Sequence, residues 1–110
     1  MEAPKLQIKE ELLLAKQSRS EGNEGRARVC ARRAAGAAVR DFLGKKEITQ
    51  KPEDAIQSLL IFGQMGELPA RVQKAVDSLV QRVNQEHNLP PEVDLIHEAG
   101  IIIEYIESIK

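Results

Sequence analysis

The arginines are the residues of this sequence whose spacing most clearly suggests a binding role. Four of them crowd eight residues of one segment: Arg26, Arg28, Arg32 and Arg33. A longer line runs through Arg26, Arg33 and Arg40, which are seven residues apart and so share one side of an α-helix. Such a line could bind the phosphates of RNA or of a nucleotide, because guanidinium groups match phosphate oxygens. The alternative is a solvated helix face whose arginines pair with glutamates on neighbouring helices.

The chain as a whole is not strongly basic, in contrast to this line of arginines. Sixteen Lys and Arg residues stand against 17 Asp and Glu residues, so the net charge is −1. Aromatic residues make up only 3% of the chain, which leaves no platform for stacking bases among the arginines. A role in binding nucleic acid would therefore need a local patch rather than the field of the whole protein.

The other candidate groups are few. Cys30 is the only cysteine, which excludes an intramolecular disulfide and a multi-cysteine metal site. The arginines nearby could lower the pKa of its thiol, whereas a lone cysteine on a helix is more often a small buried hydrophobe. His87 and His97 are the only histidines. Since a metal site needs more ligands at short spacing, we expect no metal and no other cofactor.

The pattern of apolar residues is helical throughout. Aliphatic side chains return every three or four positions in five segments, and none of them alternates as a strand would. The segments cover roughly residues 4–20, 24–43, 52–63 and 69–87, and the last follows Pro91. Their short connections favour antiparallel neighbours. We therefore predict one all-α domain over residues 1–110, an antiparallel up-and-down bundle of four to five helices.

The second segment has the pattern of a central helix. Its apolar stripe consists of Ala27, Ala31, Ala34, Ala38 and Phe42. Small residues on one face let a neighbouring backbone come close, and close packing is the expected reason for Gly36, which is unfavourable inside a helix. Asn23 is the expected N-cap of this segment, and Gly44 is its expected end.

The last segment is more apolar than one face of a small bundle requires. Leu95, Ala99, Ile102, Ile106 and Ile109 form one line, and Ile96, Gly100 and Ile103 form a second. Such a helix is buried on two sides or covers one side with a partner chain. We therefore expect a homodimer.

No apolar run approaches the ~20 residues of a membrane span, so we expect no membrane association. The N-terminal segment carries charges through its apolar stretch, unlike a signal peptide. A lone thiol fits a reducing compartment. The expected location is cytoplasmic.

Three stretches in this order carry a family resemblance. Residues 12–46 contain a helix, a small turn and a long Ala-rich helix. Residues 59–79 contain a helix, a break of Gly and Leu-Pro, and an amphipathic helix, and residues 90–110 lead from an acidic start to an Ile-rich end. In this order and spacing the chain resembles the HEPN family (higher eukaryote and prokaryote nucleotide-binding domains). The resemblance covers most of the chain and implies a bundle of four or five helices, commonly a homodimer.

The resemblance also implies a function. HEPN proteins often work beside a small nucleotidyltransferase in prokaryotic toxin–antitoxin pairs, so the leading expectation is a nucleotide- or RNA-associated module. Many members carry an Arg and a His separated by four to six residues, and Arg82 and His87 match this spacing. In ribonuclease members such a pair cleaves RNA without metal. That role would place Arg82 on a phosphate and give His87 the proton of the 2′-hydroxyl or the leaving group.

Other interpretations stay open. Arg82 and His87 could be an exposed arginine beside a histidine that interacts with the last carbonyls of a helix. The chain could be a metal-independent ribonuclease that uses this pair, or a non-catalytic helical scaffold or adaptor unrelated to HEPN. The sequence leans away from an enzyme.

Overall fold

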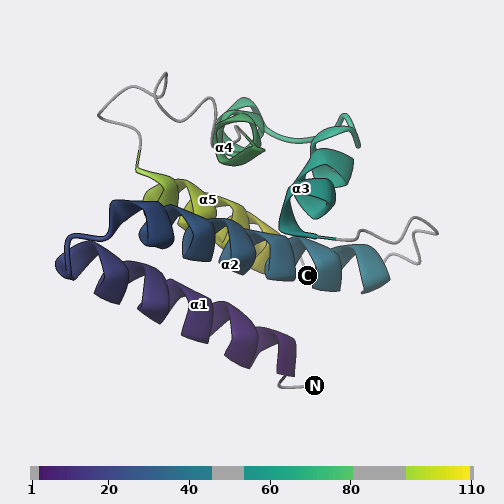
Figure 1. The fold of residues 1–110 in the computed structure, drawn as a ribbon. Helices are drawn as coiled ribbons and strands as arrows, with labels where there is room; N and C mark the ends of the chain where they lie inside the picture. The colour runs from purple at the N-terminus through teal and green to yellow at the C-terminus, as the bar shows by residue number, and fades with distance from the viewer. Residues whose placement is uncertain (1–2, 46–53, 81–93, 110) are drawn as a thin grey trace.

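The computed structural model describes residues 3–45, 54–80 and 94–109. Five helices run through these residues: α1 (Ala3–Ser20), α2 (Glu24–Lys45), α3 (Ala55–Gly63), α4 (Ala70–Val80) and α5 (Leu95–Ser108) (Figure 1). The described residues contain no strand, so the prediction of an all-α bundle is confirmed. No helix in this part of the chain has both the length and the hydropathy of a membrane span.

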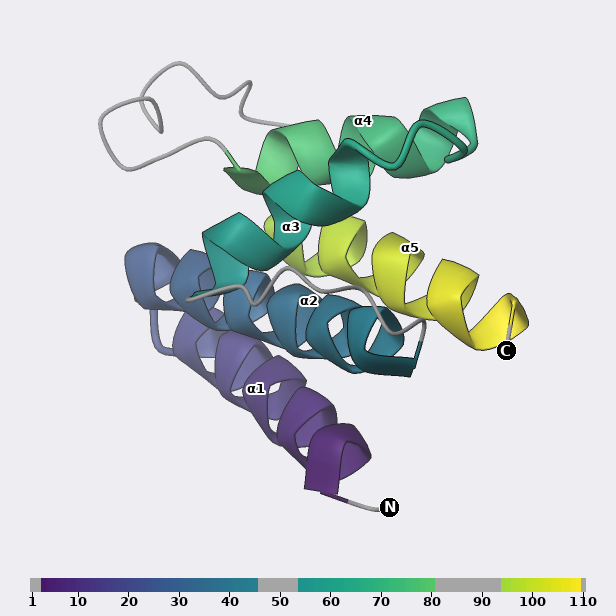
Figure 2. The same ribbon diagram turned by 90° about the vertical axis from the view of Figure 1, so that its right-hand side faces the viewer.

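Helix α2 is the centre of the bundle, as its sequence predicts. It contacts α1, α3 and α5, and α4 packs on α3 and α5. Figure 1 shows α1 on one side of α2, and α3 with α4 on the opposite side. Helices α1 and α2 are antiparallel, whereas α5 runs in the same direction as α2 in both views (Figures 1 and 2). In an up-and-down bundle, neighbouring helices alternate in direction. Helix α5 is instead parallel to its neighbour α2, because α3 and α4, which separate the two in the sequence, cross the bundle.

Side chains with oxygen acceptors begin three of the helices. Asn23 accepts a hydrogen bond from the backbone N–H of Arg26 (3.1 Å), which confirms it as the cap of α2. Asp54 accepts one from the N–H of Gln57 (2.8 Å) at the start of α3, and Asp94 caps α5. Each cap satisfies N–H groups that the helix itself leaves without a partner.

The main core lies where the α2–α5 pair meets the α3–α4 pair. Its largest fully buried side chains include Phe62, Leu43, Leu59, Leu79, Leu95 and Ile102. The ring of Phe62 meets the rings of Phe42 and Tyr105 edge to face, with centroids 5.7 and 6.4 Å apart. Aliphatic residues supply most of the remaining core, as the low aromatic content requires.

A second seam, made of small residues, joins α1 to α2. Ala15, Ala27, Cys30 and Ala34 are buried here. Elsewhere on α2, Gly36 lies directly against α3, where an added Cβ would be 2.6 Å from the Cβ of Ala55. The prediction that close packing explains Gly36 is therefore confirmed.

One expected helix end differs from the structure, and a second lies outside the described residues. Helix α2 continues through Gly44 to Lys45, so the predicted end at Gly44 is wrong. The ammonium group of Lys45 lies 3.3 Å from the carboxylate of Asp41 one turn earlier, which favours this last turn. The described part of α4 ends at Val80, and the rest of the predicted segment lies outside the described residues.

The two apolar lines of α5 have different surroundings. Leu95, Ala99, Ile102 and Ile106 are buried in the core, which confirms the first line over most of its length. Ile96 and Ile103 of the second line are only half-buried, and Ile109 at the end of the helix is 43% exposed. Helix α5 therefore keeps apolar surface beside α1 that the described chain does not cover.

Candidate functional site

The arginine line of α2 lies on the surface. Arg26, Arg33 and Arg40 are all exposed, and within residues 3–45, 54–80 and 94–109 their side chains form no ion pair. Every other arginine of these ranges has a partner through its side chain: Arg19, Arg28, Arg32 and Arg71. Pairing of the line with glutamates of neighbouring helices is thus not observed in the described chain.

The carboxylates of α2 are already engaged by other cations. Glu24 lies 2.7 Å from the guanidinium of Arg19 and 3.8 Å from that of Arg28. Asp41 pairs with Lys45. The charge of the line is therefore left to attract an anion from solvent.

The spacing of the line selects for an extended ligand. A helix rises 1.5 Å per residue, so successive arginines start about 10 Å apart and the outer two about 21 Å apart. A single phosphate cannot reach all three guanidinium groups over that length. A ligand with phosphates repeated along a chain can.

Arg32 belongs to the interior, although the sequence places it among the surface arginines. It is only 7% exposed, and its Nε donates a hydrogen bond to the carbonyl oxygen of Leu79 (2.9 Å). Arg32 therefore ties α2 to the end of the described part of α4.

Cys30 is a buried hydrophobe rather than a reactive thiol. It is 1% exposed in the seam with α1. Burial raises the pKa of its thiol, the carboxylate of Glu11 adds to this, and Arg33 and Arg26 only partly oppose it. The lowering of this pKa that neighbouring arginines could cause is outweighed by desolvation.

The predicted Arg–His pair cannot be placed. Arg82 and His87 both lie outside the described residues, so their catalytic role stays a prediction. His97 is exposed on α5. Over the described ranges no three His, Cys, Asp or Glu residues are grouped so that they could hold a metal ion.

An ion network joins the ends of three helices. Arg19, near the end of α1, donates to both carboxylate oxygens of Glu24 (3.0 and 2.7 Å) and to Asp94 (2.9 Å). The hydrogen bond from Arg19 lowers the pKa of Glu24. Burial opposes ionisation of Asp94, but hydrogen bonds from Arg19 and from the N–H of His97 outweigh it and lower its pKa. This network fixes the start of α5 against α1 and α2.

A second ion pair fixes α5 to α4. Arg71 donates two hydrogen bonds to the two carboxylate oxygens of Glu98 (2.8 and 2.7 Å). Glu98 is only 7% exposed, and the hydrogen bonds from Arg71 lower its pKa despite that burial. Both networks consist of groups that satisfy one another, so they are structural rather than binding sites.

A groove between α1 and α5 is a feature that the sequence analysis missed. One half has a volume of about 500 Å³ and is lined by Lys5, Leu6, Ile8, Lys9, Leu12, Ile103 and Glu107. The other half, of about 260 Å³, is lined by Leu12, Lys16, Ile96, His97, Gly100, Ile101 and Glu104. The available signal was the set of lysines that flanks Ile8 and Leu12 at helical spacing.

Comparison with known proteins supplies no relative whose function could be transferred. No family model, no curated protein and no solved structure matches this chain.

Proposed function

We propose that this chain is a non-catalytic, HEPN-like helical module that associates with RNA through Arg26, Arg33 and Arg40. The observation that carries the proposal is the selective lack of partners along this line. The other described arginines have side-chain partners within the chain, whereas these three share one exposed side of α2. Guanidinium groups arranged in this way bind phosphates and release the counterions that surround them.

An RNA strand fits the line better than a mononucleotide does. The three side chains are spread over about 21 Å of helix, and only a repeated phosphate backbone matches that length. Because no aromatic residue is available to stack on bases along the line, we expect weak sequence preference and strong dependence on salt.

The proposal includes the partners that the resemblance implies. These are a second copy of the chain, in a homodimer, and a small nucleotidyltransferase in a toxin–antitoxin-type pair. The apolar surface left on α5 beside α1 supports the first of these partners.

The test compares two double variants with the same change in charge. Arg26→Gln/Arg33→Gln removes two positive charges from the arginine line, and Lys45→Gln/Lys74→Gln removes two from exposed positions that line neither half of the groove. Fluorescence anisotropy of a labelled single-stranded RNA measures affinity from low to moderate salt. The arginine variant should bind at least fivefold more weakly, and the magnitude of the negative slope of log K against log salt should fall by about 1. The lysine variant should stay within about threefold of the wild type.

Three results would contradict the proposal. They are equal losses in the two variants, tighter binding of ATP than of RNA, and no binding of RNA by the wild type at low salt. The same samples, incubated without metal and run on a gel, test the ribonuclease alternative. Intact RNA is expected, whereas cleavage that disappears in His87→Ala would make the chain an enzyme.

A further inference from the structure

The floor of the groove between α1 and α5 is apolar and open. Ile8 and Ile103 line the larger half, Ile96 lines the smaller half, and Leu12 lies where the two meet. Leu6, at the edge of the larger half, is 56% exposed. Contiguous apolar surface of this kind marks an interaction site, because leaving it in water is unfavourable.

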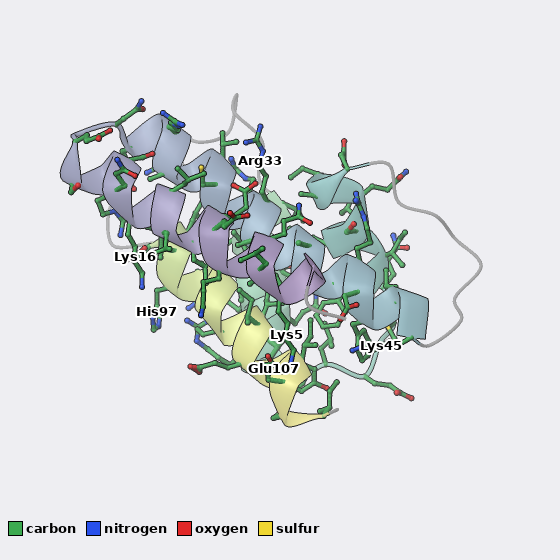
Figure 3. All side chains as sticks on the ribbon, turned by 90° about the horizontal axis from the view of Figure 1, so that it is seen from below. Lys5, Lys16, Arg33, Lys45, His97 and Glu107 are labelled. Carbon is green, nitrogen blue, oxygen red and sulfur yellow. The ribbon has the colours of Figure 1, made fainter. Side chains whose placement is uncertain are left out.

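The two rims of the groove have opposite charge. Helix α1 contributes Lys5, Lys9 and Lys16, and α5 contributes Glu104 and Glu107. Figure 3 shows Lys5 beside Glu107 at one end of the groove and Lys16 toward the other end. A partner that fits this groove must therefore place acidic groups over α1 and basic groups over α5.

Gly100 leaves room for a close approach to the floor. Glycine in the middle of a helix is unfavourable unless packing requires it. The position of Gly36 is explained by Ala55, which lies 2.6 Å from the place of a Cβ, but no atom lies within 4 Å of that place at Gly100. The described chain thus offers no packing reason for Gly100, whereas a helix from another molecule would supply one.

We propose that a second copy of this chain occupies the groove, about a two-fold axis that runs parallel to it. This inference rests on the homodimer included in the proposed function and names its interface. Rotation about that axis lays α1 of each copy over α5 of the other. Lys5 and Lys9 of one copy then face Glu107 and Glu104 of the second, and the apolar floors close on each other. A surface with one basic and one acidic rim is self-complementary in this orientation, as a two-fold interface requires.

The other possible orientation is unfavourable. A two-fold axis across the groove would lay α1 over α1 and α5 over α5. The lysines would then face lysines, and the glutamates would face glutamates, which repel each other. Charge thus selects the axis along the groove.

The proposed dimer leaves the arginine line accessible. Figure 3 shows Arg33 on the far side of α1 from Lys5, Lys16, His97 and Glu107. The two surfaces can therefore be tested separately, and each copy would present its own arginines.

The test is charge reversal followed by mixing. One variant carries Lys5→Glu/Lys9→Glu and the other carries Glu104→Lys/Glu107→Lys. Sedimentation equilibrium should show a wild-type dimer that weakens as salt is raised. Each variant alone should dissociate at least tenfold more readily, because both of its rims then carry the same sign. An equimolar mixture of the two should dimerise about as tightly as the wild type. An effect confined to one chain could not produce this rescue.

Gly100→Leu supplies a second, steric test. It fills space that is open in the described chain, so thermal unfolding of the dilute protein should change little while dimerisation weakens at least tenfold. Wild-type protein that stays monomeric at 100 μM, or variants that dimerise as well as the wild type, would overturn the inference. If such a monomer still binds RNA, the interface is wrong but the proposed RNA binding by the arginines stands. If the protein forms a charge-dependent dimer that binds no RNA, the interface stands and the proposed RNA binding is wrong.

Discussion

At the scale of single residues, Gly36 has the closest approach to a neighbouring element among the described glycines. An added Cβ would lie 2.6 Å from the Cβ and 2.7 Å from the Cα of Ala55, and Cα is backbone that cannot rotate away. Overpacking of this kind costs about 1–3 kcal/mol, which exceeds the gain of up to about 1 kcal/mol from the better helix propensity of Ala. Gly36→Ala should therefore lower the free energy of unfolding in a urea titration.

Gly44→Ala is the matched control, because nothing lies within 4 Å of the place of a Cβ at this exposed position of α2. It should be neutral or should stabilise by less than about 1 kcal/mol. Two variants of equal effect would show that Gly36 does not lie against α3 as described.

The Arg71–Glu98 ion pair should make the free energy of unfolding depend on pH. The pKa of Glu98 is lowered in the folded state, chiefly by the hydrogen bonds from Arg71, so the unfolded chain binds more protons in acid. The contribution of the pair is complete above the ordinary value of 4.5 and disappears as the pH falls through the folded pKa. Arg71→Gln should thus destabilise most at pH 7, and its difference from the wild type should shrink toward pH 3.

Urea titrations of both proteins at pH 7, 5, 4 and 3 measure this difference. The comparison between the two proteins cancels the other carboxylates with lowered pKa, Glu24 and Asp94. A difference that stays constant with pH would mean that the two side chains do not pair in solution.

Single residues were predictable from the sequence where the cause is local. The cap at Asn23 and the packing of Gly36 follow from residue type and position within a segment, and both are confirmed. The partners of the arginines were not predictable. Arg19 pairs with Asp94, 75 residues away, and Arg32 bonds to a carbonyl of α4, so only the folded chain decides which arginines stay in solvent.

At the scale of the elements, Asp94 combines two tasks at the start of α5. Its carboxylate accepts hydrogen bonds from the N–H groups of Ile96 and His97 (3.0 and 3.2 Å) and also pairs with Arg19. Loss of a cap costs about 1 kcal/mol, and an exposed ion pair contributes up to about 1 kcal/mol. Asp94→Ala should cost about 1–2 kcal/mol in chemical unfolding, and Asp94→Asn, which keeps the cap, should cost less than about 1 kcal/mol.

Asp54 provides the comparison, since it caps α3 without an ion pair in the described chain. Asp54→Ala should cost about 1 kcal/mol, and Asp54→Asn should be close to neutral. If Asn costs the same at both positions, the link between α1 and α5 through Arg19 does not contribute to stability.

The five described helices were predictable, with approximate bounds wherever the structure describes them, because periodicity and caps are properties of short segments. The direction of α5 was not. Short connections predict antiparallel neighbours, but α5 packs on α2 after a long excursion through α3 and α4, and sequence neighbours do not determine that contact.

At the scale of the whole molecule, the chain presents two surfaces of different chemistry. The arginine line of α2 is cationic, and the α1–α5 groove is apolar with rims of opposite sign. The sequence showed the first as a spacing of seven within one helix. It did not show the groove, because α1 and α5 come from opposite ends of the sequence and lie side by side only in the folded chain.

The most direct test of the central claim is a titration of ¹⁵N-labelled protein with a short single-stranded RNA, followed by amide chemical shifts. If α2 binds phosphates through its arginine line, the largest shifts should map to the exposed side of α2 around Arg26, Arg33 and Arg40, while amides around Lys9 and Gly100 change little. Shifts concentrated in the α1–α5 groove, or no shifts on α2 at saturating RNA, would contradict it.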